Sequence, residues 1–205
     1  MSMKEAKIQF LVDAACDLFL SRSIFEVTIK DVALKAGVAE MTIYRAFEKK
    51  SNLVLAVALK LEERIESNYF ATRTEKTGFE RLKAFYESYL DIFTASPELY
   101  RFISEFDAFI KSERPEGSLS DYETGLDRLK ERFLESYRMG LEDGSVRPVD
   151  DIEMFYLSTA HALLELCKKL SFSGDLLEQD KKVVKAEEIR MLIRIFLSMF
   201  DPSHA

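Results

Sequence analysis

Hydrophobic residues recur three and four positions apart along most of the chain, which is the spacing of amphipathic helices. Over residues 4–22, for example, Ile8, Val12, Ala15 and Phe19 fall on one helical face. The strict alternation of apolar and polar residues that marks half-buried strands is nearly absent. The pattern therefore predicts an all-α protein.

About nine helices are predicted in total. The first covers residues 4–22, a second, short helix ends at Gly37, and further helices follow at 40–47, 50–72, 78–95, 97–111, 120–143, 150–171 and 179–200. The clearest loops are residues 111–120, which hold Pro115 and Gly117, and residues 143–148, which hold Gly144.

The second and third helices are joined by a tight turn. Thr28 can cap the second helix and Asp31 can answer it three residues later, as a capping box. Gly37 suits the left-handed turn after that helix, and small Ala33 and Ala36 allow close helix contact. This order predicts a helix-turn-helix domain over residues 1–50, followed by a larger helical domain over 51–205.

Residues 8–53 resemble the TetR family of transcriptional regulators. The resemblance rests on Ala14-Ala15, Leu18-Phe19, Thr28-Ile29, Val32-Ala33, Ala36-Gly37-Val38, Thr42-Ile43-Tyr44, Phe47, Lys50 and Leu53. The chain departs from the usual pattern at Ala39, where a polar cap is common, and at Met41, where a Gly is common. Beyond Leu53 the resemblance is architectural, and it implies that the larger domain binds a ligand and dimerises.

The resemblance and the chemistry of the side chains together indicate the phosphate contacts. Thr28 would lie beside a phosphate at the positive end of a helix. Thr42 and Tyr44 look like donors to the DNA backbone. Lys49 and Lys50 are at the start of the fourth helix, where the helix dipole disfavours cations, so a nearby phosphate would explain them.

Base reading is expected from the exposed side chains of the third helix, which are Glu40, Met41 and Arg45. Arg45 can pair with guanine, and Glu40 can accept a hydrogen bond from cytosine. Contact of either with the DNA backbone or with solvent is the alternative.

Charge and composition narrow the functional classes. The net charge is −7, yet residues 1–50 hold eight Lys and Arg against seven Asp and Glu, so the head is at +1 and the remainder at −8. DNA binding must then depend on a few cations. With two His and two Cys and no Gly-rich phosphate loop, the sequence predicts no enzyme, catalytic residue, metal or cofactor. Cys16 and Cys167 are expected to be buried, reduced thiols of a cytoplasmic protein.

Aromatic residues gather in the middle of the chain. They suggest an apolar cavity between helices, as the resemblance also implies, and plain core packing is the alternative. The candidate pocket residues are Tyr86, Phe102, Phe106, Tyr137 and His161.

The last helix is apolar on most of its surface, since nine of the twelve residues from Ile189 to Phe200 are hydrophobic. Such breadth implies burial on two sides, whereas its length and two arginines do not suit a membrane span. We therefore expect a homodimer interface formed with the preceding helix, and the candidate residues are Leu163, Cys167, Leu170, Ile189, Ile193, Phe196 and Phe200.

The resulting hypothesis is a ligand-responsive regulator that binds double-stranded DNA at a palindromic operator. The resemblance implies a repressor that a small, largely apolar inducer releases. The alternative is a helical partner-binding protein whose helix-turn-helix no longer binds DNA.

Overall fold

A computed structural model describes residues 2–71, 75–113, 119–172, 178 and 180–204. Within these residues the chain is all helical, as predicted, and contains no strand. Its α-helices are α1 (Met3–Ser21), α2 (Ile29–Ala36), α3 (Glu40–Phe47), α4 (Lys50–Tyr69), α5 (Gly78–Ala95), α6 (Glu98–Ser112), α7 (Ser120–Glu142), α8 (Ile152–Phe172) and α9 (Lys185–Ser198). None of these helices is both long and apolar enough to cross a membrane.

The predicted helix boundaries differ from the observed ones mainly at α9. We expected this helix from residue 179, but it begins at Lys185. Asp180–Lys182 form a separate 3-10 turn, and Val184 is extended at the start of α9, with φ −76° and ψ 109°. No side chain caps this end. The predicted loop at 111–120 falls largely outside the described residues.

The chain divides into two compact units. The N-terminal unit contains Met1–Arg64 and Arg101–Thr124, and the C-terminal unit contains Ile65–Tyr100 and Gly125–Ala205. The N-terminal unit therefore includes residues from the middle of the sequence, and the division falls inside α4, α6 and α7. The domain boundary at residue 50 stays a prediction.

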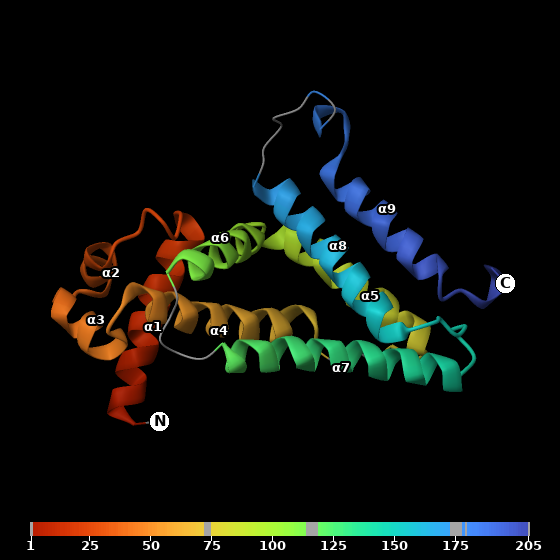
Figure 1. Ribbon diagram of the computed structural model, residues 1–205, viewed down its shortest axis with the longest axis horizontal. Coiled ribbons are helices and arrows are strands. Elements are labelled where there is room, and N and C mark those ends of the chain that lie inside the picture. Colours follow the sequence, from red (N-terminus) through yellow and green to blue (C-terminus); the bar gives the residue numbers. More distant parts are fainter. Residues whose placement is uncertain (1, 72–74, 114–118, 173–177, 179, 205) are drawn as a thin grey trace. The chain divides into compact units, whose positions relative to one another are not determined.

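In the N-terminal unit, α2 packs against both α1 and α3 (Figure 1). Leu11 and Phe19 of α1, Ile24 of the connection and Ile43 of α3 are fully buried. Burial of such side chains stabilises the fold by about 1.5–3 kcal/mol each. The small core stabilises α2 and α3, which have eight residues each and would be marginal as isolated helices in water.

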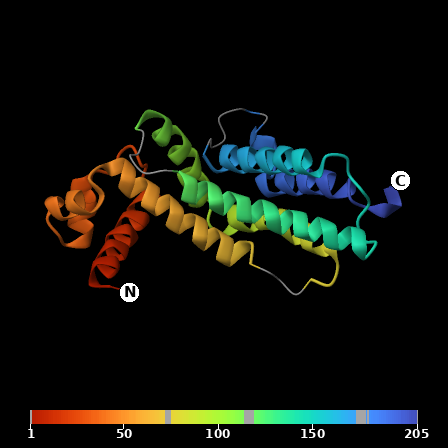
Figure 2. The same cartoon turned by 60° about the horizontal axis from the view of Figure 1, so that its bottom comes forward.

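In the C-terminal unit, α8 and α9 lie side by side and α5 packs against both (Figures 1 and 2). Aromatic rings fill this core: Phe133 of α7 lies 5.1 Å from Tyr156 and 5.4 Å from Phe85 between ring centroids. Tilted and edge-to-face ring pairs of this kind add about 0.5–1.5 kcal/mol each beyond their buried area.

Two glycines allow α5 and α7 to approach closely in the C-terminal unit. A Cβ atom on Gly78 would lie only 2.0 Å from the backbone nitrogen of Gly140. The connection after α7 then caps α5, because Asp143 accepts a hydrogen bond from the Gly78 N–H at 2.8 Å and Ser145 accepts one from the Phe79 N–H. Hydrogen bonds from the Ser145 side chain, the Gly78 N–H and the Ser145 N–H lower the pKa of Asp143.

Candidate nucleic-acid interface

The turn between α2 and α3 has the geometry that a helix-turn-helix requires. Gly37 ends α2 in the left-handed region, at φ 64° and ψ 34°, where a residue with a Cβ would be strained. The Val38 N–H then donates to the Ala33 carbonyl at 3.0 Å. Ala33 and Ala36 are buried, which allows the two helices to approach. The predicted helix-turn-helix is confirmed.

A capping box forms the start of α2, as predicted. The Thr28 hydroxyl accepts a hydrogen bond from the Asp31 N–H at 3.1 Å, and the Asp31 carboxylate accepts from the Thr28 N–H at 2.8 Å. The Thr28 hydroxyl also donates to that carboxylate. The bonds from the Thr28 N–H and hydroxyl lower the pKa of Asp31. A phosphate contact by Thr28 stays a prediction, and it would compete with this carboxylate for the hydroxyl proton.

One face of α3 packs against the core, and the opposite face is exposed. Ile43 and Phe47 are buried against the core. Met41 is 59% exposed and Tyr44 is 42% exposed, and Arg45 is also exposed. Tyr44 and Arg45 follow Met41 by three and four positions, which places them on the same side of the helix as Met41.

The other predicted contacts on α3 are at its first turn. Glu40 is exposed and Thr42 is half-buried. Ala39 precedes the helix and provides no side-chain cap, so the N–H groups of this turn rely on other acceptors. DNA contact by this surface stays a prediction.

The two lysines after α3 differ in environment. Lys49 is exposed, whereas Lys50 is half-buried. The Lys50 ammonium donates to the Ile24 carbonyl at 2.5 Å and lies 5.3 Å from the centre of the Phe109 ring. Burial lowers its pKa. Lys50 therefore joins α4 to the connection between α1 and α2, and the phosphate contact predicted for it would require this ammonium to leave a protein partner.

Arg101 of α6 closes the end of α1. Its guanidinium donates to the carbonyls of Phe19, Leu20 and Arg22 at 3.0, 2.6 and 3.1 Å. The last turn of α1 contains no basic residue of its own. Arg101 therefore satisfies carbonyl groups that a helix end leaves without intrahelical partners.

Glu105, one turn further along α6, holds the next segment. Its carboxylate accepts a hydrogen bond from the Ile24 N–H at 2.7 Å and pairs with Arg101 at 3.3 Å. Glu105 is 7% exposed. The sequence analysis did not identify Arg101 or Glu105. The available signal was an Arg and a Glu four positions apart, on a helix whose neighbouring positions Phe102 and Phe106 are apolar.

The five predicted pocket residues are divided between the two units. Phe102 and Phe106 belong to the N-terminal unit, where their stacked rings are 6.1 Å apart. Tyr86 and Tyr137 are core residues of the C-terminal unit. The Tyr86 hydroxyl pairs with Thr159 at 2.8 Å, and the Tyr137 hydroxyl accepts from a backbone N–H.

His161 lies on the exposed face of α8. The neighbouring helical positions explain this, because Thr159 and Leu163 take the buried face. Four members of the set are thus buried within their own units and His161 is exposed, and a ligand pocket formed by these residues stays a prediction.

The predicted interface residues on α8 and α9 are largely buried against other parts of the same chain. Those buried are Leu163, Cys167, Leu170, Ile189, Ile193 and Phe200, and Phe196 is half-buried against Tyr86. Contacts of α8 and α9 with the rest of their own unit use these side chains. Their contact with a second copy stays a prediction, and within one chain they belong to the core.

The outer faces of α8 and α9 expose hydrophobic residues among charged ones such as Glu165 and Lys169. Exposed hydrophobic residues on them and on the segment before α9 are Met154, Leu157, Val183, Val184, Met191, Ile195 and Met199. Between the helices lies a groove of about 790 Å³, lined mainly by apolar atoms of residues such as Leu166, Met191 and Ile195. Contiguous exposed apolar surface of this kind marks interaction sites.

Comparison with known proteins connects the N-terminal helices to a family. The family described as "Bacterial regulatory proteins, tetR family" matches residues 11–57. The chain is 35% identical over 83 residues to the HTH-type transcriptional regulator AlkX of Mycobacterium tuberculosis, a match that covers 40% of this chain and 37% of that protein. The chain thus spans well under half of this relative's length.

Two solved structures share the fold across nearly the whole chain. A TetR transcription regulator from Haloarcula marismortui has a TM-score of 0.76 at 15% identity, covering 96% of this chain and 99% of its own. A transcriptional regulator from Saccharomonospora viridis in complex with choline has a TM-score of 0.70 at 20% identity, covering 95% and 96%. The similarity of the C-terminal region lies in its fold.

Proposed function

This chain belongs to the TetR family of bacterial regulatory proteins, and we propose that it is a DNA-binding transcriptional regulator that works as a homodimer in the cytoplasm. It represses transcription from a palindromic operator until a small effector releases it. Nothing in this function requires a catalytic group or a cofactor.

The exposed face of α3 carries the DNA-binding proposal. Met41, Tyr44 and Arg45 project from a helix that Gly37 and two buried residues hold in place. The major groove is wide enough for one helix. Arg45 reads a guanine, Tyr44 and Thr42 bind the DNA backbone, and Lys49 supplies a positive charge beside a phosphate.

The apolar outer face of α8 and α9 carries the dimer proposal. A second copy is the occupant that fits, because a symmetric contact covers the same groove on both chains at once. Two α3 helices are then presented to half-sites one DNA turn apart. In this proposal the exposed residues of this face, with Met191 and Ile195 at its centre, make the contacts between the two copies.

Effector control is a shift between two arrangements of the dimer. A ligand that binds more tightly to the arrangement whose recognition helices do not match the operator shifts the dimer toward that arrangement. Operator affinity then falls, by at most the ratio of the ligand's affinities for the two arrangements. The choline complex of the Saccharomonospora viridis regulator supports small-molecule binding by this fold.

Selection of bound duplexes from a random pool tests the DNA-binding proposal. We expect a palindromic consensus, with affinity falling by about 0.9 log units per decade of salt for each phosphate neutralised. Arg45→Ala should cost about 1–3 kcal/mol and relax one base position, whereas Lys49→Ala should weaken all duplexes alike. Arg138→Ala, at an exposed position on α7, is the control.

Recovery of no duplex would contradict DNA binding and favour the partner-binding alternative. The acidic net charge of −7 and the uncapped start of α3 are the observations that support this alternative. A promoter-reporter assay then separates repression from activation.

Light scattering after gel filtration tests the dimer. We expect a dimer at micromolar concentration, and Ile195→Glu should convert it to a folded monomer because it places a charge in the apolar groove. Arg138→Glu is the control for an added acidic residue. A monomer in the unaltered protein would overturn the proposal.

A further inference from the structure

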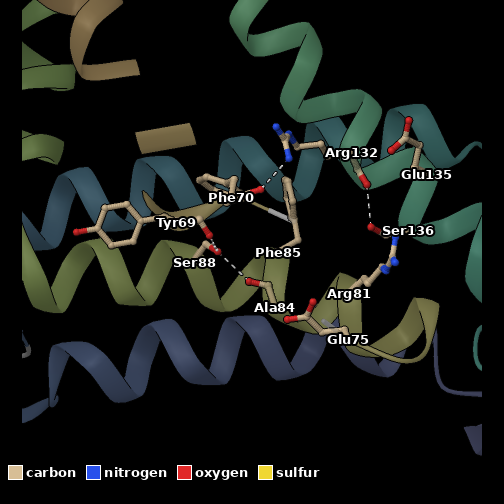
Figure 3. Close-up of a pocket in the computed structure, with 11 residues that line it drawn as sticks. Tyr69, Phe70, Glu75, Arg81, Ala84, Phe85, Ser88, Arg132, Glu135 and Ser136 are labelled. Atoms are coloured by element: carbon tan, nitrogen blue, oxygen red, sulfur yellow. Dashed lines mark hydrogen bonds between the residues drawn. The ribbon is translucent and has the colours of Figure 1, made fainter. Parts of the chain in front are cut away.

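A small cavity lies in the C-terminal unit, where the end of α4 meets α5 and α7 (Figure 3). Its volume is about 70 Å³. A buried water needs roughly 10–15 Å³ by the same kind of measure, so the cavity holds a molecule about the size of five waters. Aromatic rings of Tyr69, Phe70 and Phe85 line it, and none of the five predicted pocket residues does.

Most polar groups of the cavity already have partners. The Ser88 hydroxyl donates to the Tyr69 carbonyl at 2.6 Å, and the Ser136 hydroxyl donates to the Arg132 carbonyl at 2.8 Å. The Arg132 guanidinium donates to the Phe70 carbonyl and pairs with Glu66 at 2.8 Å. These groups shape the cavity, and the charge of Arg132 is balanced.

Arg81 is the exception. Its guanidinium comes from α5 toward Ser136 of α7 (Figure 3). The Nε atom is buried and has no hydrogen-bond partner among the described residues. A buried donor of a charged group without an acceptor is costly, so this atom requires an acceptor that the described residues do not supply.

We propose that this cavity binds the carboxylate of a small aliphatic acid, with Arg81 as its anchor. A carboxylate offers two acceptor oxygens to the planar fork of a guanidinium, which is a strong, charge-assisted arrangement. The short hydrocarbon stem packs against Phe70 and Phe85. The cavity volume limits the ligand to about five non-hydrogen atoms.

Two further carboxylates border the cavity, and they set its selectivity. Glu75 is half-buried and Glu135 is exposed, with its carboxylate directed away from Arg81 (Figure 3). Their negative charge disfavours multivalent anions such as phosphate more than a monocarboxylate. The role of this cavity as the effector site of the dimer rests on the proposed function, whereas the binding of a carboxylate in the cavity does not.

Titration of the full-length protein with propionate, propylammonium and inorganic phosphate tests the site, with calorimetry and ligand-observed NMR as readouts. We expect propionate to bind, and the other two to bind at least tenfold more weakly. Arg81→Gln should weaken propionate at least tenfold. Arg81→Lys keeps the positive charge but not the planar pair of donors, so its affinity for propionate should lie between those of the unaltered protein and Arg81→Gln. Lys83→Gln removes a charge from the same helix outside the cavity and should change nothing.

Circular dichroism of each variant checks that it is folded, and Arg81→Lys keeps the test valid if Arg81→Gln does not fold. Equal binding of propionate by the unaltered protein and a folded Arg81→Gln would overturn the proposal. So would a preference for phosphate or propylammonium. Operator affinity is measured on the same samples without ligand. Loss of operator binding alone contradicts the proposed function, whereas loss of propionate binding alone contradicts this site.

Discussion

In the N-terminal unit, hydrogen bonds that cap and join the helices add to a small apolar core, whereas in the C-terminal unit aromatic rings pack around a close helix crossing. In the first, Arg101 and Glu105 bind backbone groups of residues 19–24. In the second, Phe85, Phe133 and Tyr156 form a continuous ring cluster.

The difference suits what each unit leaves exposed. The N-terminal unit presents a polar helix face that must keep a defined geometry, and directional hydrogen bonds provide it. The C-terminal unit presents an apolar groove and contains a cavity. Packing around them depends on the complementary shapes of side chains more than on directional hydrogen bonds. Four substitutions test the contrast, beginning with the largest expected effect.

Arg101→Ala should have the largest effect on stability, about 3–5 kcal/mol. It removes donors to three carbonyls and leaves the buried Glu105 without its cation. Urea denaturation measures the change, and Lys111→Ala, exposed on the same helix, should stay within about 0.5 kcal/mol. A loss below about 1 kcal/mol for Arg101→Ala would mean that apolar packing dominates this unit as well.

Gly78→Ala should follow, at about 2–3 kcal/mol, because a methyl group there collides with the backbone of Gly140. Thermal unfolding monitored by circular dichroism provides the measurement. Gly78→Asn should be worse than Ala, since the strain comes from volume. A neutral Gly78→Ala would show that the crossing of α5 and α7 is loosely packed.

Gly37→Ala should cost about 1–2 kcal/mol for a different reason. The space around Gly37 is empty, but its φ of 64° lies in the left-handed region. Asn, which tolerates that region, should therefore recover part of the loss, the reverse of the order at Gly78. The same ranking of Ala and Asn at both glycines would contradict the distinction between backbone strain and close packing.

Thr28→Ala should have the smallest effect, about 1 kcal/mol, through loss of the cap on α2, and Thr28→Ser should retain it. The lowered pKa of Asp31 adds a pH dependence. Its contribution is present above the unfolded pKa, near 3.9, and is lost as the pH falls through the lower folded pKa. Urea midpoints between pH 2 and 6 should be less pH-dependent for Asp31→Asn, and an unchanged profile would exclude this carboxylate.

Local patterns predicted the N-terminal helices well because their signals are short-range. A cap at Thr28, a left-handed Gly37 and apolar residues at helical spacing each act within a few positions, and the structure confirms all three. The faces of α3 also followed from spacing, since Ile43 and Phe47 could only share the inner side.

Side chains that meet across long stretches of sequence were not predictable in this way. Hydrophobic spacing indicated that α9 is apolar around most of its surface, but it did not show which side of the helix faces the rest of the chain. Ile193 became core and Ile195 became surface, two positions apart on one helix. The choice depends on where α5 lies, which no local pattern contains.

The sequence by itself determined an all-helical chain with a helix-turn-helix near its start, because caps, turns and helical periodicity are encoded by residues close together. Only the tertiary structure decided that Arg101 and Glu105 hold the end of α1, that Lys50 turns toward Ile24, and that the buried Nε of Arg81 lacks an acceptor among the described residues beside a cavity. Each of these depends on the burial of a charged group by distant parts of the chain, and burial is what makes a partner for that charge necessary.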